Sequence, residues 1–187
     1  KAADGGSFRG YLALPASGRG PGIVLCQEIF GINAYIREVA DYYAEEGYVV
    51  LAPDLFWRLD RDVELGYTEA DWKKAFEYFQ RFDTDKGMED ITAAVRALRA
   101  RPDVAGKVGA LGFCLGGRLA YLAAARAGVD CAVGYYGVTI DQYLKDAARI
   151  KVPMVLHFAA NDKYAPPETV EKIKAAGLRH GKPLHWF

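Results

Sequence analysis

The chain has 187 residues, of which 51% are hydrophobic and 26% are charged, and its 24 Lys and Arg balance 24 Asp and Glu. This composition is typical of a globular domain and excludes the disordered and fibrous classes. Because domains commonly hold about 100–200 residues, we expect residues 1–187 to form a single domain. A net charge of zero gives no electrostatic footprint for nucleic acid or an anionic membrane, so small-molecule or protein partners are expected.

The cysteines and the apolar stretches indicate the cellular compartment of the protein, and the chain ends indicate whether the sequence continues. Three cysteines are too few and too widely spaced for a disulfide framework, and no Cys-x-x-Cys pair suggests a metal site. We therefore expect a reducing, cytoplasmic location and, by default, a monomer. No apolar stretch approaches the roughly 18–20 residues that span a bilayer, and no secretory signal is evident. The sequence begins at Lys1 and stops at Phe187 within an apolar run, so we expect the natural chain to continue beyond it.

The elements follow one another in a regular order. Residues 7–15 alternate in polarity after an Asp-Gly-Gly turn signal, which predicts an edge strand reached through a hairpin. Five short apolar runs then indicate strands buried on both faces, at 22–26, 48–52, 107–111, 131–135 and 153–158. Stretches with helical periodicity lie between or after them, at 34–46, 69–82, 85–100, 115–127 and 167–180. Since helical crossovers join parallel strands, we predict an α/β fold with a mostly parallel sheet and helices on both faces.

The loops at the carboxyl ends of these strands are where reactive groups are expected in such a sheet. One of them, Gly112-Phe113-Cys114-Leu115-Gly116-Gly117, joins a strand to an Ala-rich helix and matches the G-x-S-x-G nucleophile elbow with Cys in place of Ser. The glycines let strand and helix backbones pass closely, and the helix N-terminus favours a thiolate, which predicts a lowered pKa. We interpret Cys114 as a nucleophile; the alternative is a buried structural cysteine, as we interpret Cys26 and Cys131.

A nucleophile in this fold works with an acid and a histidine that follow it in the chain. Asp162, after a later strand, meets the requirement for the acid; its alternative role is an Asx turn or a helix cap. For each of the three histidines a structural role explains the position better than a catalytic one. His157 lies in a predicted strand, His180 at a helix end and His185 in the final strand-like segment. We therefore expect the catalytic histidine to lie beyond Phe187.

The motifs Gln-Glu-Ile-Phe-Gly at 27–31, Ala-Pro-Asp-Leu at 52–55, the elbow, Gly-Tyr-Tyr-Gly at 134–137 and the Asn161-Asp162 loop together resemble the dienelactone hydrolase family of α/β hydrolases. The resemblance implies an α/β-hydrolase fold and hydrolysis of a cyclic enol-lactone, dienelactone, to maleylacetate, with related members acting on other esters. It implies no metal or organic cofactor.

The resemblance also implies residue roles. Cys114 and Asp162 match two members of a Cys-His-Asp triad, and Glu28 matches the family's glutamate that holds or deprotonates the thiol. A buried carboxyl group would have the raised pKa that suits this role, whereas the alternative is an ordinary loop carboxylate. The oxyanion hole would use the backbone N–H of Leu115, from the elbow, and of Ile29, by resemblance.

One pair of positions departs from the family pattern. An arginine and a tyrosine that help hold the substrate carboxylate in well-known members correspond here to Trp72 and Phe76, which cannot pair with an anion. Arg81 is on the same predicted helix but does not take over the role. These replacements favour a more apolar or differently charged ester or lactone. Tyr136 and Phe113 are further candidates to line the cleft, although aromatic residues near strand ends usually belong to the core.

Three functions remain open at this point. The first is an ester or lactone hydrolase acting through Cys114, and the second is a broad carboxylesterase or thioesterase of the same fold. The third is a non-catalytic binding protein that kept the fold, because fold alone does not fix function. Labelling of Cys114 and hydrolysis of an activated ester would separate the enzymes from the binding protein.

Overall fold

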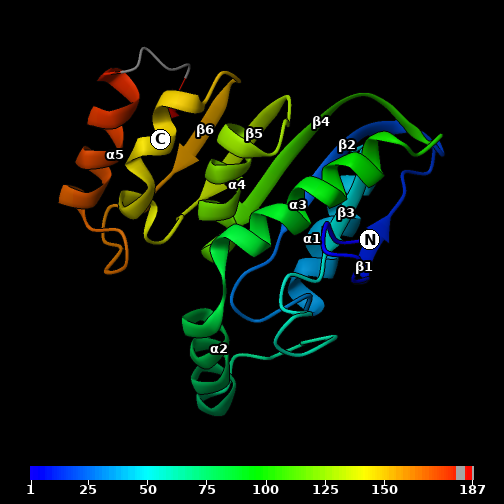
Figure 1. Ribbon diagram of the computed structural model, residues 1–187, viewed down its shortest axis with the longest axis horizontal. Coiled ribbons are helices and arrows are strands. Elements are labelled where there is room, and N and C mark those ends of the chain that lie inside the picture. Colours follow the sequence, from blue (N-terminus) through cyan, green and yellow to red (C-terminus); the bar gives the residue numbers. More distant parts are fainter. Residues whose placement is uncertain (180–183, 187) are drawn as a thin grey trace.

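The computed structural model describes residues 1–179 and the backbone of residues 184–186, and it is organised around one sheet of seven strands (Figure 1). The strand order is β1-β3-β2-β4-β5-β6-β7, and every neighbouring pair is parallel except β1 with β3. The strands are β1 Gly10–Ala13, β2 Gly20–Cys26, β3 Val49–Pro53, β4 Val104–Phe113, β5 Cys131–Tyr135, β6 Met154–His157 and β7 Leu184–Trp186. The predicted mostly parallel α/β sheet is confirmed.

The first strand takes a different partner from the one that the sequence suggested. β1 is an edge strand as predicted, but the predicted hairpin is wrong, because β1 pairs antiparallel with β3, Gly10 opposite Pro53. The next strand in the chain, β2, has Val24, Leu25 and Cys26 fully buried and lies between β3 and β4. Both edges of this apolar strand are thus occupied by parallel neighbours, which leaves the short, partly exposed β1 at the rim.

Five α-helices begin and end within one residue of the predicted bounds: α1 Ala34–Glu45, α2 Glu69–Arg81, α3 Thr84–Arg99, α4 Leu115–Arg126 and α5 Pro167–Arg179. Side-chain caps explain several of these starts, since Asn33 caps α1, Thr68 forms a capping box with Asp71 at α2, and Asp83 caps α3. A 3-10 segment, η1 Ile140–Arg149, was not predicted. It is irregular at Tyr143, so it carries no sustained helical periodicity.

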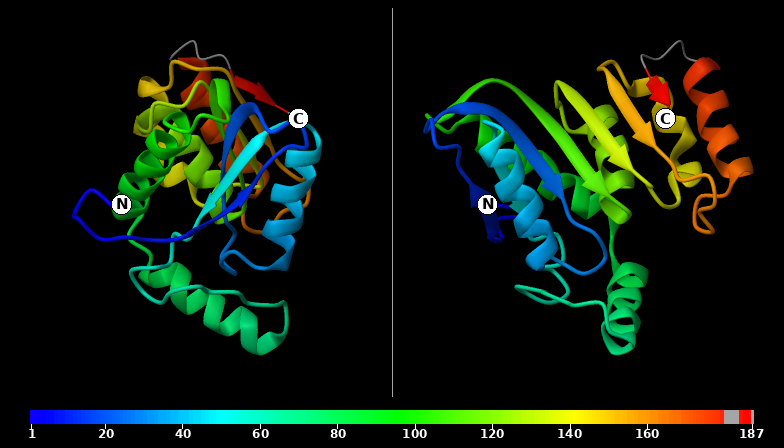
Figure 2. Two further views of the ribbon diagram at one scale, coloured as in Figure 1. Left: turned by 90° about the vertical axis from the view of Figure 1, so that its right-hand side faces the viewer. Right: turned by 180° about the vertical axis from the view of Figure 1, so that it is seen from behind.

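The helices cover the sheet in two layers (Figure 2). On one face α3 and α4 pack against the central strands in the larger apolar core, and on the other face Ile36, Ala40 and Ala44 of α1 bury the smaller one. Helix α2 instead projects beyond the carboxyl ends of the strands (Figures 1 and 2), and buries only Ala75 and Tyr78. This arm therefore stands over the edge of the sheet where the reactive loops were expected.

The cysteines outside the elbow behave differently from each other. Cys26 is fully buried in β2, which confirms its structural role. Cys131 is exposed at the start of β5, so its prediction as a buried strand cysteine is wrong. The first residue of a strand can lie at the rim of the sheet, beyond the helices that cover its middle.

Glycines in the elbow permit three backbones to meet. A Cβ atom on Gly116 would lie 2.1 Å from the Cys26 carbonyl oxygen of β2, and one on Gly112 would lie 2.1 Å from the Gly116 carbonyl oxygen. Real Cβ atoms do not approach backbone atoms so closely, and neither neighbour is a flexible side chain. The helix can thus begin directly against β2 and β4 only because these positions carry no side chain, which confirms the physical reason for the motif.

This contact predicts the effect of adding one methyl group. We expect Gly116→Ala to lower the free energy of unfolding by about 3 kcal/mol or more, because strand and helix must separate. Gly66→Ala is the matched control, since its Cβ would meet only the carboxylate end of Asp71, which can move. Urea unfolding followed by circular dichroism measures both. Equal midpoints for the two variants would contradict the close-packing argument.

Candidate functional site

Cys114 occupies a strained turn between β4 and α4. Its φ of 55° and ψ of −118° lie outside the regions that side chains with a Cβ atom prefer. Its N–H donates to the Tyr135 carbonyl oxygen at 3.0 Å, and its own carbonyl oxygen accepts from Gly117, Arg118 and Val138 at 3.0 to 3.3 Å. Such strain persists only where the surroundings hold it, and here β5 and the first turn of α4 do so. The geometry is that of the predicted nucleophile elbow.

A cavity of about 290 Å³ lies between the carboxyl ends of the strands and α2. Glu28, Cys114 and Asp162 line it together, although they come from three separate loops after β2, β4 and β6. Four other residues predicted for the site also line it: Ile29, Trp72, Phe76 and Tyr136. The fold thus brings the three candidate catalytic side chains to one hollow.

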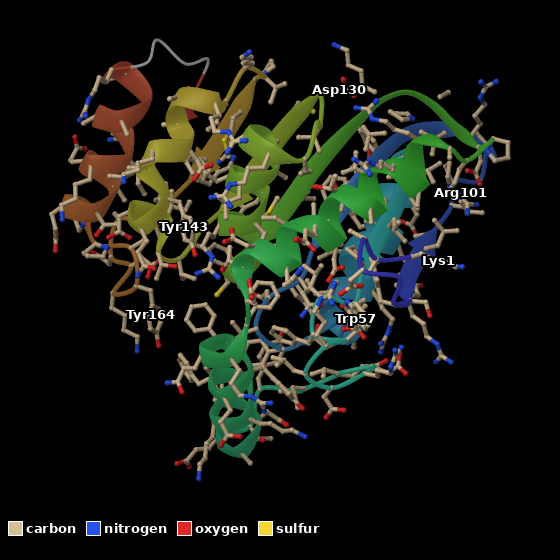
Figure 3. All side chains as sticks on the ribbon, viewed as in Figure 1. Lys1, Trp57, Arg101, Asp130, Tyr143 and Tyr164 are labelled. Carbon is tan, nitrogen blue, oxygen red and sulfur yellow. The ribbon has the colours of Figure 1, made fainter. Side chains whose placement is uncertain are left out.

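The sequence analysis did not predict six other residues that line the cavity: Phe30, Tyr67, Phe79, Val138, Thr139 and Tyr164. Tyr164 enters from the loop between β6 and α5 (Figure 3), which the sequence shows only as a polar turn. Phe79 lies one turn beyond Phe76 on α2 and follows the same face of that helix. Its helical spacing from Trp72 and Phe76 is the signal that was available.

Two predicted residues do not present their side chains to the cavity. Phe113 is absent from the lining, and its ring stacks on Tyr135 with centroids 5.1 Å apart, in the core beneath α1. Substrate contact by Phe113 is therefore not supported, because its ring packs on the sheet face that α1 covers. The Leu115 side chain is fully buried, but the prediction concerns its backbone N–H, which donates toward the Cys114 sulfur.

Glu28 is a buried carboxyl group with two phenol neighbours. It is 9% exposed, and the hydroxyls of Tyr136 and Tyr67 each donate to it over a long 3.5 Å. Burial raises its pKa, and the two phenols oppose that rise only in part. Its backbone is fixed by fully buried Gln27, whose amide nitrogen donates to the Glu28 carbonyl oxygen and whose amide oxygen accepts from Leu55 N–H at 3.0 Å.

The thiol of Cys114 does not have the lowered pKa that its place at a helix N-terminus predicted. Burial, the largest cause, and the negative charges of Glu28 and Asp162 together raise this pKa to about 12, although the Leu115 N–H and Arg118 act to lower it. Helix ends contribute about one kcal/mol or less in ordinary settings, so desolvation and two nearby carboxyl groups outweigh them. The thiol of this structure is protonated at neutral pH.

Asp162 adopts the turn that was considered as its alternative role. One carboxylate oxygen accepts from the Tyr164 N–H at 2.8 Å, which is an Asx turn. The same side chain lines the cavity with Cys114. A turn that fixes one oxygen orients the other, so the structural role and a catalytic role are compatible.

The histidines were expected to be structural. The His157 ring stacks on Tyr135 at 4.4 Å with an interplanar angle of 6°, and it is not among the residues that line the cavity. His180 and the side chain of His185 lie outside the described residues, as does any residue beyond Phe187.

Arg118 is a charged residue that the sequence analysis missed. It is 5% exposed, and its guanidinium donates to the hydroxyls of Thr139 at 2.6 Å and Thr84 at 3.3 Å. In the part of the chain that the structure describes, no carboxylate pairs with it and its Nε has no partner. Burial lowers its pKa. An arginine four residues after the nucleophile, on an otherwise Ala-rich helix, was the available signal.

Among residues 1–179 no group of three or more His, Cys, Asp or Glu is arranged to hold a metal ion. No helix in this range is long and apolar enough to cross a membrane.

Comparison with known proteins identifies the family. The model of the dienelactone hydrolase family matches residues 8–185. A carboxymethylenebutenolidase of Pseudomonas putida is 38% identical over 186 residues, which cover 98% of this chain and 79% of that protein. Carboxymethylenebutenolidase 1 of Cupriavidus pinatubonensis is 35% identical over 185 residues, with 98% and 79% covered.

Solved structures agree on the fold. The crystal structure of a dienelactone hydrolase-like promiscuous phosphotriesterase from metagenomic libraries superposes with a TM-score of 0.81 at 26% identity, covering 100% of this chain and 77% of that one. The sheet is accordingly that of an α/β hydrolase. The chain belongs to the dienelactone hydrolase family and is a carboxylic ester hydrolase of the dienelactone hydrolase type.

Proposed function

We propose that this hydrolase cleaves an ester or lactone through an acyl-enzyme formed on the sulfur of Cys114. The observation that carries the proposal is the placement of Cys114, in a strained elbow, on the same cavity wall as Glu28 and Asp162. A thiol aimed into a cavity beside two carboxyl groups has both a proton acceptor and an orienting acid within the site. Neither Cys26 nor Cys131 lines this cavity.

In the first step the Cys114 S–H bond breaks, its proton moves to the Glu28 carboxylate, and the sulfur attacks the substrate carbonyl carbon. The negative charge that forms on the carbonyl oxygen is stabilised by backbone N–H groups of Leu115 and Ile29. The support for this pair is that Leu115 N–H already points toward the sulfur and Ile29 borders the cavity. The carbon–oxygen bond then breaks, and the leaving oxygen takes the proton held by Glu28, so that the alcohol departs from an ester or stays attached to the acyl chain of an opened lactone.

In the second step water attacks the thioester, releases the acid and returns a proton to the sulfur. The base for this water is a histidine oriented by Asp162, which we place after residue 187. The support is indirect: Asp162 lines the cavity with one oxygen fixed by its Asx turn, whereas His157 is stacked on Tyr135.

Glu28 has a second effect in the proposal, since its charge adds to the burial that keeps the thiol protonated until substrate arrives. The Cys114 pKa of about 12 means that very little thiolate is present at neutral pH. Because the thiolate is the reactive form toward oxidants and alkylating agents, the resting thiol is protected.

The nucleophile is tested by acylation. We expect Cys114→Ala to abolish hydrolysis of p-nitrophenyl acetate and to prevent addition of one acetyl group to the protein, as measured by rapid-quench mass spectrometry. Cys131→Ala, which removes an exposed cysteine outside the cavity, is the control and should keep both. Acetylation of Cys114→Ala at an unchanged rate would overturn the proposal.

The state of the thiol is tested by its pH dependence. Since the Cys114 pKa is about 12, its alkylation by iodoacetamide should rise about tenfold per pH unit from pH 7 to 10 without a plateau. Peptide mass spectrometry separates this site from Cys131. A plateau below pH 8 would show that a thiolate already exists in the resting protein.

Glu28→Gln separates the two effects of the glutamate. Removing its charge should lower the Cys114 pKa, so alkylation at pH 8 should become several-fold faster. Loss of the proton acceptor should nevertheless slow ester hydrolysis by about 10²-fold or more. The exposed Glu46→Gln serves as control. Unchanged hydrolysis in Glu28→Gln would exclude Glu28 as the base.

Asp162 is tested in the natural full-length protein. We expect Asp162→Asn to lower kcat by about 10²-fold or more while the amount of acetylated Cys114 during turnover increases, because release of the acyl group needs the oriented base. Asn161→Ala, beside it in the same loop, is the control. Full activity of Asp162→Asn would assign Asp162 to the turn alone.

A further inference from the structure

The cavity is rich in aromatic side chains, since seven of the thirteen described residues that line it are aromatic. Those of α2 and of the loop after β2 form one wall. Phe30 meets Trp72 edge to face at 4.9 Å and 86°, and Trp72 meets Phe76 at 5.7 Å. These contacts hold the rings in place before any ligand binds.

The outer part of this wall is open to solvent. Trp72 and Phe76 are 38% and 37% exposed, although both are large and apolar. Exposed aromatic surface at the mouth of a cavity is the kind that a ligand covers, and a flat ring of the substrate gains both burial and ring contacts there. The size of the cavity, about 290 Å³, is at the lower end of ligand pockets, so one ring and a short acyl group fill it.

The described residues that line the cavity carry charges of one sign. Glu28 and Asp162 contribute two carboxyl groups, and none of the thirteen lining residues in the described part of the chain is a Lys, Arg or His. Arg118 does not line the cavity. Its guanidinium donates a hydrogen bond to the hydroxyl of Thr139, and Thr139 is one of the lining residues. A substrate with a free carboxylate would therefore meet two acidic groups and, among the lining residues that the structure describes, no cation.

We infer that the substrate of this site is an uncharged aryl ester or aromatic lactone whose ring lies on the Phe30, Trp72 and Phe76 wall, and that substrates carrying a free carboxylate are disfavoured. This inference rests on the proposed function of Cys114. It adds a substrate class, which the catalytic residues alone do not specify.

The test compares phenyl acetate with 4-acetoxybenzoate, two acetate esters that differ by one carboxylate, each normalised to its rate of hydrolysis by hydroxide. We expect kcat/KM to be at least about tenfold higher for phenyl acetate, and the difference to shrink at high salt because the repulsion is screened. Cyclohexyl acetate, which lacks the aromatic ring, should also be a poorer substrate after normalisation. Equal or reversed preference in either pair would overturn the inference.

A charge introduced into the wall sharpens the test. Phe76→Arg should raise kcat/KM for 4-acetoxybenzoate relative to phenyl acetate by about tenfold or more, whereas Phe76→Leu should leave the discrimination by charge in place. Ala70→Arg adds the same charge on α2 outside the cavity lining and should not change the ratio. An equal change in Ala70→Arg and Phe76→Arg would attribute the effect to general surface charge and overturn the inference.

The experiments distinguish a failure of the proposed function of Cys114 from a failure of the inferred substrate class. If Cys114→Ala keeps full activity toward phenyl acetate, the proposed function fails. If hydrolysis requires Cys114 but prefers the carboxylate-bearing ester, only the inferred substrate class is wrong.

Discussion

The contact on which the site depends is the approach of the first turn of α4 to the backbones of β2 and β4. It is possible because Gly112 and Gly116 have no side chain. A Cβ atom at either position would lie only 2.1 Å from a backbone carbonyl oxygen. With the helix starting so close to the strands, the residue between them must reverse direction sharply, and Cys114 adopts a positive φ. The same strain that costs stability aims the sulfur into the cavity. These glycines are therefore needed both for the packing of α4 on the sheet and for the position of the Cys114 sulfur.

The site separates reactivity from recognition. In the proposed function the reactive groups lie on loops that the rigid sheet positions, and burial together with the charges of Glu28 and Asp162 raises the pKa of the Cys114 thiol. In the substrate class that we infer, recognition falls largely to α2, a helix that projects from the body of the protein (Figure 1) and brings Trp72, Phe76 and Phe79 to the cavity. A change on this arm can alter which ester enters without disturbing the elbow, because few core residues belong to the helix.

Much of the fold could be predicted from the sequence, because its local signals are strong. Continuous apolar runs identified the central strands, and helical periodicity placed five helices to within one residue. The elbow and the loops with Glu28 and Asp162 could be named in advance, since the carboxyl ends of parallel strands share one edge of the sheet. The 3-10 segment η1 could not, because its irregularity at Tyr143 erases the periodic pattern.

The sequence by itself determined the central strands, the five α-helices and which loops carry the candidate site residues, since these follow from local pattern and chain order. Tertiary structure decided the antiparallel pairing of β1 with β3, the exposure of Cys131 and the burial of the Phe113 ring away from the cavity. It also decided the raised pKa of Cys114 and the burial of Arg118 without a carboxylate partner among the described residues. Burial and electrostatic environment depend on neighbours distant in sequence, so no local pattern contains them.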